Sequence, residues 1–425
     1  MSLSDSQRRR LLGARHLLAP SARTDDVAAI ARALVALHST DPVSVYLSVL
    51  ARMRHPDLDA VADQLYSQRS LIRHHAMRTT LWVAPIDTVA VMHQACTVKI
   101  ADVQRRRTEK FLADSGVADP GAWLQDAKDQ VRDLLAQHSP ISSREIGRLL
   151  PDIARPLVMA EGKPYAGTQG AHSRVLAGLA FDGVVVRTRP AGTWIGAQYA
   201  WALMRDWSPE VHEALSRTSQ PMATPEAQTR LAALWLSRFG PGTERDLSWW
   251  AGWTLGDTRA ALASSGAQQV MISEGAAWML PTPTEHEQGD DAEVRDAEPR
   301  EAELGDAELG DAEGRGDEPW VALLPGLDPS VMGWKERAFY LAPGGEAAWD
   351  TNGNAGPTIW VDGAVVGAWA QTNSGQIALH SFVDVPAHRW RQIEDRAEQV
   401  REWLGETRIS WRFPGAINAE LIGPR

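Results

Sequence analysis

The spacing of apolar residues predicts a largely helical first third of the chain. Apolar positions recur at helical intervals in four stretches, residues 8–18, 25–37, 43–53 and 58–66. Residues 79–83 are instead apolar and β-branched, which predicts a strand, and a further helix is expected after Pro85. Together these patterns define an N-terminal domain of residues 1–135.

Two later stretches share the order helix, turn, helix and hairpin. The first predicts helices at residues 140–150 and 173–181, then strands at 183–188 and 193–195. The second predicts helices and then two strands around a tight turn at Glu274-Gly275, at residues 231–239, 243–250, 255–263, 270–272 and 278–280. This order is typical of a winged helix. We therefore predict tandem winged helices in residues 136–225 and 226–283, and a third inside the first domain.

The end of the chain has a different pattern. Short strands are predicted at residues 358–361, 365–372 and 377–383, with Asp362-Gly363 as a hairpin turn. A helix at residues 386–404 and a last strand at 408–412 follow. Several short antiparallel strands with one helix predict a small β-barrel-like domain or curled sheet in residues 320–425. The whole chain is thus expected to have an α+β fold of tandem winged helices followed by this domain.

An acidic repeat separates the last two domains. Residues 291–315 are five near-copies of one pentad, which begins Asp-Ala-Glu in four of them. Such low hydrophobicity and high charge cannot support a packed core, so residues 284–319 are expected to be a disordered insert. An alternative is that the segment mimics the charge of DNA and screens non-specific binding.

This insert also explains the net charge of −11. Residues 285–318 contain 15 acidic residues and three arginines, a net charge of −12, so the remainder carries about +1. Basic clusters remain at Arg8-Arg9-Arg10 and at Arg105, Arg106 and Arg107. Winged helices commonly place one helix against DNA but also serve as protein–protein modules. Charge does not exclude DNA as the partner.

The composition excludes several other classes. Cys96 is the only cysteine, which rules out an internal disulfide and a cysteine-rich zinc site and indicates a reducing, cytoplasmic setting. No run approaches the roughly 18 to 20 apolar residues of a membrane span, and the first ten residues do not resemble a signal peptide. No carboxylate cluster has metal-ligand spacing, so no metal or cofactor is expected.

One polar turn carries residues suited to chemistry, Leu37-His38-Ser39-Thr40-Asp41-Pro42. It follows an apolar helical face that ends at Leu37. In extended backbone, residues two apart project to the same side, so His38 and Thr40 are expected to face one water while Ser39 points away. The simpler interpretation is a helix end in which Thr40 or Asp41 caps the next helix.

Four segments resemble the winged-helix DNA glycosylases of bacteria, the AlkZ/YcaQ-like family. The first is residues 226–263, which contain Phe239-Gly240-Pro241-Gly242-Thr243 and Trp249-Trp250-Ala251-Gly252. The second and third are residues 323–328 and 361–369. The fourth, residues 78–83, is similar to the family's Arg-Gly-Thr-Leu-His-Leu but departs from it at Thr79 and Trp82. The family's catalytic motif, Gln-x-Gln or Gln-x-Asp, aligns on His38 and Thr40, so this chain has a variant motif or has lost catalysis.

The resemblance implies excision of alkylated purines, especially bulky N7-guanine adducts of a natural-product genotoxin or crosslinks, in DNA repair or antibiotic self-resistance. A monomer that binds double-stranded DNA carrying alkylated bases is expected. His38, with an ordinary pKa of about 6.5, would accept the proton of a water that Thr40 orients. Further candidates are Asp41, Arg78 and Trp82 as support for the site. Candidates for DNA binding are Arg105, Arg106, Arg107, Trp334, Lys335 and Arg337.

Two rival functions stay open. The protein can be a DNA-binding regulator or adduct binder without catalysis. A metal-dependent nuclease is a more distant alternative, because the carboxylate cluster that it needs is missing. No lysine stands out as a Schiff-base nucleophile, which favours a monofunctional glycosylase over a lyase.

Overall fold

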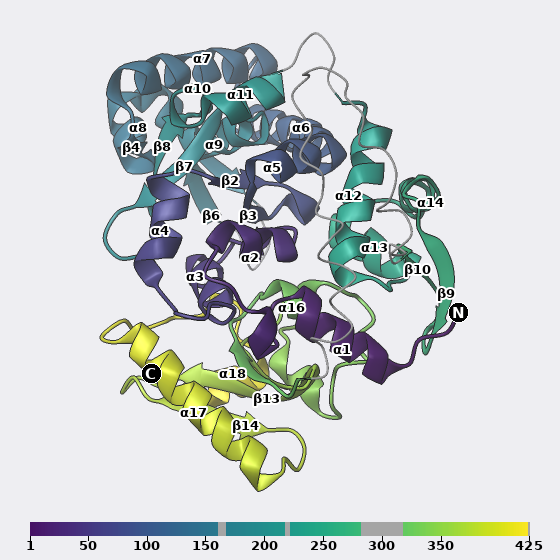
Figure 1. The fold of residues 1–425 in the computed structure, drawn as a ribbon. Helices are drawn as coiled ribbons and strands as arrows, with labels where there is room; N and C mark the ends of the chain where they lie inside the picture. The colour runs from purple at the N-terminus through teal and green to yellow at the C-terminus, as the bar shows by residue number, and fades with distance from the viewer. Residues whose placement is uncertain (160–166, 217–221, 282–317, 424–425) are drawn as a thin grey trace, which may run out of the picture.

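The computed structural model describes residues 1–159, 167–216, 222–281 and 318–423. The acidic repeat therefore lies outside the described residues. Helices and strands gather in three groups around a central N-terminal segment (Figure 1). Helices α6 to α11 form the first group, α12 to α14 with one hairpin form the second, and the C-terminal sheet with α17 and α18 forms the third.

The predicted N-terminal helices are all present. They are α1 (Asp5–Arg15), α2 (Val27–Ala33), α3 (Pro42–Leu50), α4 (Leu58–Tyr66) and α5 (Ile86–Met92). Strands β1 (Leu37–His38), β2 (Leu71–His75) and β3 (Leu81–Pro85) form an antiparallel sheet of order β1-β3-β2. The strand predicted at residues 79–83 starts later, because Arg78 and Thr79 adopt positive φ angles of 55° and 63° in the turn before it.

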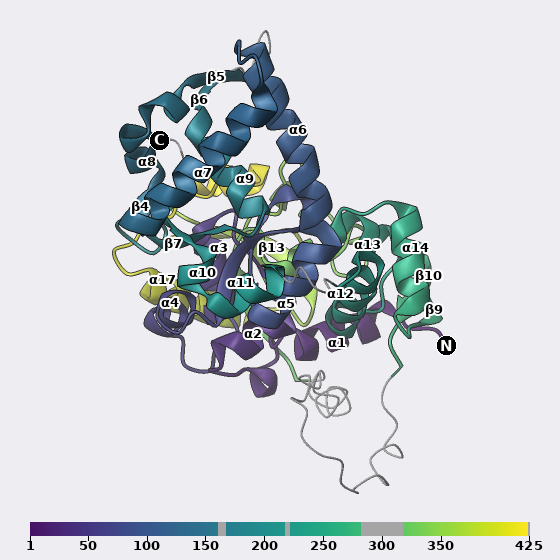
Figure 2. The same ribbon diagram turned by 90° about the horizontal axis from the view of Figure 1, so that it is seen from above.

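The second unit contains the helices predicted at residues 140–150 and 173–181 and the strand predicted at 183–188, and it adds two long helices and a strand pair that the sequence did not predict; both added helices begin within the predicted N-terminal domain of residues 1–135. Its helices are α6 (Val98–Asp114), α7 (Pro120–His138), α8 (Ser143–Leu149), α9 (Ala171–Phe181), α10 (Met204–Trp207) and α11 (Pro209–Ser216). Strands β4 (Ile141–Ser142), β7 (Val185–Pro190) and β8 (Tyr199–Leu203) form one sheet, and β5 (Pro156–Met159) pairs with β6 (Gly167–Gly170). Figure 2 shows α6 running from this unit towards α12 and α13.

The hairpin of this unit corrects one prediction. The second strand is β8, and residues 193–195 lie in the loop before it. In this loop Gly192 has a φ of 82°, and the Ala191 N–H donates to the carbonyl of Gln198 across the base of the loop. The apolar residue Trp194, which suggested a strand, packs its ring 5.0 Å from that of Tyr46 on α3 instead.

The third unit follows its prediction closely. It contains α12 (Thr224–Phe239), α13 (Glu244–Ala251), α14 (Leu255–Ser264) and the hairpin of β9 (Gln268–Ile272) and β10 (Gly275–Met279). Helix α13 begins with a capping box between Thr243 and Asp246 and ends at Gly252, whose φ of 75° suits a residue without a side chain. That these units act as winged helices stays a prediction.

The C-terminal part is built on an antiparallel sheet of order β11-β12-β13-β14. Its elements are β11 (Val321–Leu324), α16 (Pro329–Met332), β12 (Thr358–Val361), β13 (Ala364–Gln371), β14 (Ile377–Ser381), α17 (Ala387–Leu404) and α18 (Ala416–Ile422). The turn Asp362-Gly363 is confirmed, with positive φ at both residues. The barrel is not confirmed, because the described strands form an open sheet whose edges are β11 and β14.

The strand predicted at residues 408–412 is wrong. These residues form no strand in the structure, and the chain passes from them into α18, which the sequence pattern did not predict. Their backbone is used elsewhere, since the Arg412 N–H donates to the carboxylate of Asp41 at 3.1 Å. The exposed–buried alternation in this segment therefore reflects packing of its side chains without strand pairing, because the Trp411 ring lies 5.7 Å from that of Trp369 on β13 and the Ile409 N–H donates to the Gln371 side chain at 2.9 Å.

Buried contacts join the predicted domains. One apolar core contains Trp82, Trp235 and Trp360, which belong to three different predicted domains. Arg52, in the turn after α3, donates to Asp328 at 2.9 Å, and both side chains are fully buried. A buried ion pair of this kind is strongly destabilised when one partner is removed. The N-terminal and C-terminal parts are thus held together as one body around β1.

Candidate active site

The polar turn lies directly after β1, at an edge of the three-stranded sheet. His38 pairs with Trp82 of β3, and the Ser39 N–H donates to the carbonyl of Leu81 at 2.7 Å, which extends the ladder by one residue. Pro42 then occupies the first turn of α3, where its missing N–H costs nothing. The turn is therefore fixed by backbone pairing on one side and by a helix start on the other.

His38 is buried and neutral. Its side chain is 3% exposed, and its ring centroid lies 4.6 Å from that of Trp82. Burial, and next the charge of Arg78, lower the pKa of His38 to about 3. The sequence predicted that His38, with a pKa near 6.5, accepts a proton from water. This prediction is corrected, because a ring with a pKa near 3 is a weak base at neutral pH.

The hydrogen bonding of His38 assigns its tautomer. The Thr40 N–H donates to Nδ1 of His38 at 3.4 Å. A neutral imidazole carries one hydrogen, so this bond leaves it on Nε2. His38 then offers a hydrogen-bond donor at Nε2, and its remaining lone pair is already engaged by the backbone.

Ser39 does not point into an empty space. Its Oγ accepts a 2.9 Å hydrogen bond from Nε of Arg73, and both side chains are buried. The Arg73 guanidinium lies 4.6 Å from the centroid of the Tyr199 ring and donates weakly to the Tyr66 hydroxyl at 3.4 Å. The sequence pointed to the serine but not to its partner. An arginine in the buried strand β2 was the only available signal.

Thr40 and Asp41 are held by the C-terminal segment. Arg412 donates its backbone N–H to Asp41 at 3.1 Å and its side-chain Nη1 to the Thr40 carbonyl at 3.2 Å. Burial raises the pKa of Asp41. The Oγ1 of Thr40 is buried and has no hydrogen-bond partner among the described residues. This hydroxyl is therefore free to bind a water or a substrate atom.

Arg78 connects the turn to the third unit and the C-terminal part. Its guanidinium lies 4.2 Å from the centroid of the Trp249 ring, and that of Arg337 lies 5.4 Å from the same ring. Arg337 also lies 5.0 Å from the ring of Trp349. The predicted candidates Arg78 and Arg337 are thus linked through Trp249, which the sequence indicated only as part of a family motif.

A sequence model of the DNA glycosylase AlkZ-like family matches residues 31–403. The chain belongs to this family. Its members are DNA glycosylases, which cleave N-glycosyl bonds and take DNA as their substrate. At the predicted catalytic positions, His38 is a buried neutral ring, and Oγ1 of Thr40 has no hydrogen-bond partner among the described residues.

The fold agrees with the family. The solved structure of the Streptomyces sahachiroi DNA glycosylase AlkZ superposes with a TM-score of 0.66 at 18% sequence identity, covering 97% of this chain and 100% of that one. No curated protein matches the sequence. Arg412, which holds the turn, lies beyond the matched residues 31–403.

Two predicted tryptophan contacts need correction. Trp82 is 1% exposed and donates to the Met77 carbonyl at 3.3 Å, so it supports the ring of His38 and cannot stack on a base. Trp334 is 3% exposed and donates to the Phe239 carbonyl at 3.0 Å, in the core between α12 and the C-terminal part. Both rings are therefore too deeply buried to contact DNA in this structure.

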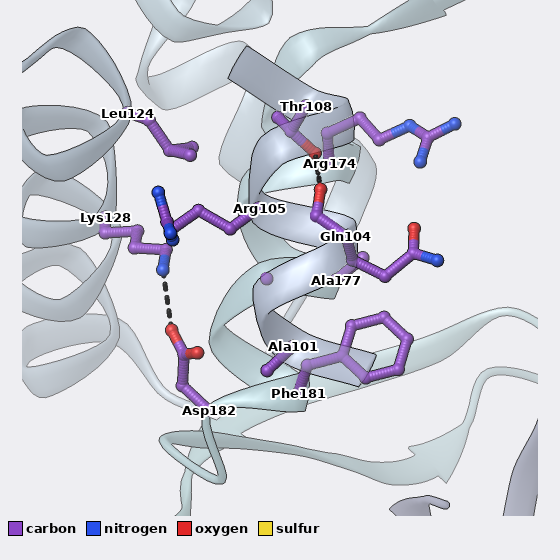
Figure 3. Close-up of a pocket in the computed structure, with 11 residues that line it drawn as sticks. Ala101, Gln104, Arg105, Thr108, Leu124, Lys128, Arg174, Ala177, Phe181 and Asp182 are labelled. Atoms are coloured by element: carbon purple, nitrogen blue, oxygen red, sulfur yellow. Dashed lines mark hydrogen bonds and ion pairs between the residues drawn. The ribbon is translucent and has the colours of Figure 1, made fainter. Parts of the chain in front are cut away.

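The remaining predicted DNA contacts are exposed. Arg105, Arg106 and Arg107 lie on α6, and Lys335 follows α16. Arg105 is paired with Glu109 at 2.8 Å and borders a pocket of about 50 Å³ between α6, α7 and α9 (Figure 3). Such a pocket is too small for a nucleobase. Within the described part of the chain, no group of three or more potential ligands could hold a metal ion, and no helix could cross a membrane.

Proposed function

We propose that this protein is a monofunctional DNA glycosylase that hydrolyses the N-glycosidic bond of purines with bulky adducts at N7, in repair or antibiotic self-resistance. Membership of the AlkZ-like family gives the reaction class. The observation that carries the proposal for this chain is the free hydroxyl of Thr40 beside the neutral ring of His38, at the position of the family's catalytic pair.

The chemistry suits a site with few ionised groups. Alkylation at N7 gives the purine a positive charge, so the base leaves with the electrons of its bond to C1′ and becomes neutral. The sugar becomes an oxocarbenium-like cation that water attacks readily. The water then needs orientation more than deprotonation. Nε2–H of His38 would donate to one lone pair of the water oxygen and Oγ1 of Thr40 would accept one of its hydrogens, which leaves the second lone pair to attack C1′. The proton that the new C1′ hydroxyl releases would pass to the solvent, and the buried carboxylate of Asp41 would stabilise the cationic sugar.

A hydrolytic and not a lyase mechanism is consistent with the groups around the turn. The charged side chains that contact residues 38–41 or act on them are Arg73, Arg78 and Arg412. A guanidinium stays protonated and does not form a Schiff base. Borohydride is therefore expected to trap no covalent complex between the protein and DNA during excision.

The test is single-turnover excision from duplex DNA carrying one N7-alkylguanine adduct, without added metal. The parent protein should release the modified base and leave an abasic site. His38→Ala should slow release by about 10² to 10³, the usual loss of one positioned donor. His38→Gln supplies a neutral amide donor, as the family motif does, and should keep most of the parent rate. The exposed His55 gives the matched control His55→Ala.

The outcomes separate the rival functions. Binding of the adduct without release of a base would support the non-catalytic DNA-binding protein. Loss of activity in both His38→Ala and His38→Gln would instead make the imidazole a required proton acceptor. Because the pKa of His38 is about 3, the neutral ring persists above that pH, and its protonation should cause no inflection of the rate between pH 5 and 8.

A further inference from the structure

Arg78 is held in an unusual backbone conformation beside the turn. Its φ of 55° and ψ of 32° are left-handed, and Thr79 also has a positive φ. Such values are uncommon for residues with side chains and persist only where surrounding structure enforces them. Gly252 provides the necessary space, because a Cβ there would lie 3.3 Å from both the backbone N and Cγ of Arg78. The fold thus directs this side chain towards Trp249.

Two arginines share this tryptophan without a carboxylate. Arg78 and Arg337 both lie over the ring of Trp249. No ion pair between described residues includes either of them, and Glu336 is paired with Arg245 at 3.4 Å. Burial, and next the charge of Arg337, lower the pKa of Arg78 to about 10. Two neighbouring like charges therefore lack the anion that would normally stabilise them.

Several donors around this pair also lack acceptors. The Nε atoms of Arg78 and Arg337 and Nε1 of Trp349 are buried and have no hydrogen-bond partner among the described residues. Arg337 donates a long bond from Nη2, at 3.5 Å to the Gly353 carbonyl, and its side chain also bonds the Tyr340 side chain. Buried donors are nearly always satisfied, by protein, water or ligand. Three unsatisfied donors and two unpaired charges together indicate a missing anionic acceptor.

We propose that Arg78 and Arg337, stacked on Trp249, form a clamp for the phosphodiester backbone of the DNA strand next to the excised base. The guanidinium fork matches the geometry of phosphate oxygens, and stacking on an aromatic ring restricts its motion. Arg78 is also the charge that acts on His38, so the clamp places a backbone phosphate close to the reacting sugar. This assignment rests on the proposed function, which supplies the base that the strand carries.

The clamp is distinct from the exposed arginines of the surface. Arg105 and Arg401 are each paired with a glutamate on their own helix. Exposed pairs of this kind contribute little to binding, because water and salt screen them. Arg78 and Arg337 are partly buried and unpaired, so we expect a larger effect from each of them.

The test measures affinity for a short undamaged duplex, and for the same duplex with the adduct, over a range of salt concentrations. Arg78→Met and Arg337→Met should each weaken binding by roughly 10-fold. Each should make the slope of log affinity against log salt shallower by about one. Arg401→Met, on α17, is the matched control and should match the parent. Arg78→Lys keeps the charge and should keep the slope while losing part of the affinity.

Phosphate ethylation identifies the contacted group. Ethylation of phosphates beside the adduct should weaken binding of the parent but not of the double variant Arg78→Met/Arg337→Met. Identical interference patterns for the parent and the double variant would overturn the clamp. The clamp would also be overturned if folded Arg78→Met and Arg337→Met variants bound DNA with the affinity and salt dependence of the parent. Melting temperatures establish folding, and the uncharged variants Arg78→Gln and Arg337→Gln provide the same readout if a Met variant does not fold. A clamp that behaves as expected in a protein that releases no base would refute only the proposed function.

Discussion

The two faces of the sheet β1-β3-β2 hold different sets of buried ionisable groups. One face carries His38, Trp82 and His74, which are direct cross-strand neighbours, and His74 bonds His93 at 3.1 Å. The other face carries Arg73, which donates to Ser39 and lies among tyrosine rings, together with His75, whose pKa burial lowers to about 3. The first face is neutral, and the second keeps the positive charge of Arg73.

The chemistry of the side chains explains this difference. An imidazole loses its proton when it is buried, so the pKa of His38 falls to about 3 and that of His93 to about 4. A guanidinium cannot lose its charge in a protein, so Arg73 must instead find acceptors and aromatic faces. Because residues alternate along β1, the polar turn contributes His38 to the neutral face and Ser39 to the charged one.

The largest effect that we expect is a loss of stability in acid, caused by the buried histidines, of which His38, His74 and His93 belong to the neutral face. Unfolded histidines take up protons below about pH 6.5, whereas these three, and the buried His16 and His75, stay neutral to much lower pH in the folded protein. Stability is therefore complete above pH 6.5 and falls as pH decreases, by about 1.4 kcal/mol per histidine for each pH unit. Urea unfolding at pH 7, 6 and 5 measures this slope.

One substitution isolates a single histidine. His93→Gln can still bond His74 but does not titrate, so it should remove about one histidine's share of the slope. His55→Gln, at an exposed position, should leave the slope unchanged. An unchanged slope in His93→Gln would mean that the neutral face does not control acid stability.

A smaller effect is expected on the charged face, at Ser39. Ser39→Ala leaves Nε of the buried Arg73 without its acceptor, and a hydrogen bond to a charged group contributes about 1.5–3 kcal/mol. Excision should also slow, because the hydrogen bond between Arg73 and Ser39 holds the polar turn in place. The sequence predicted only that Ser39 points away from the water between His38 and Thr40. Ser48 is the matched control, since its Oγ is equally buried but has no partner in the described structure.

Urea unfolding and single-turnover excision measure the two consequences. Ser48→Ala should change neither quantity. Equal unfolding free energies for Ser39→Ala and the parent would show that Arg73 finds another acceptor and that the two faces are not distinguished by this bond.

Local pattern predicted most elements, and tertiary contacts decided the site. Helix α4 occupies the predicted residues 58–66, because its apolar face repeats regularly. The turn at residues 38–41 was predicted as the chemical position from its residue types together with the family resemblance. Its surroundings were not predictable: Arg73 lies 34 residues away and Arg412 more than 370 residues away in sequence. The low pKa of His38 also depends on burial that only the complete fold provides.

The smallest effect concerns Thr40, whose hydroxyl separates catalysis from stability most cleanly. Thr40→Val keeps the shape of the side chain and removes only Oγ1, which has no partner within the described residues. No protein hydrogen bond is lost, so the unfolding free energy should stay at or slightly above that of the parent. If the hydroxyl holds the attacking water, excision should slow by about 2- to 10-fold, as for one neutral hydrogen bond. Thr40→Ser, which retains the hydroxyl, should keep the parent rate. Parent excision by Thr40→Val would show that the water is oriented by His38 alone, and the neutral face would then supply the only side chain that acts on it.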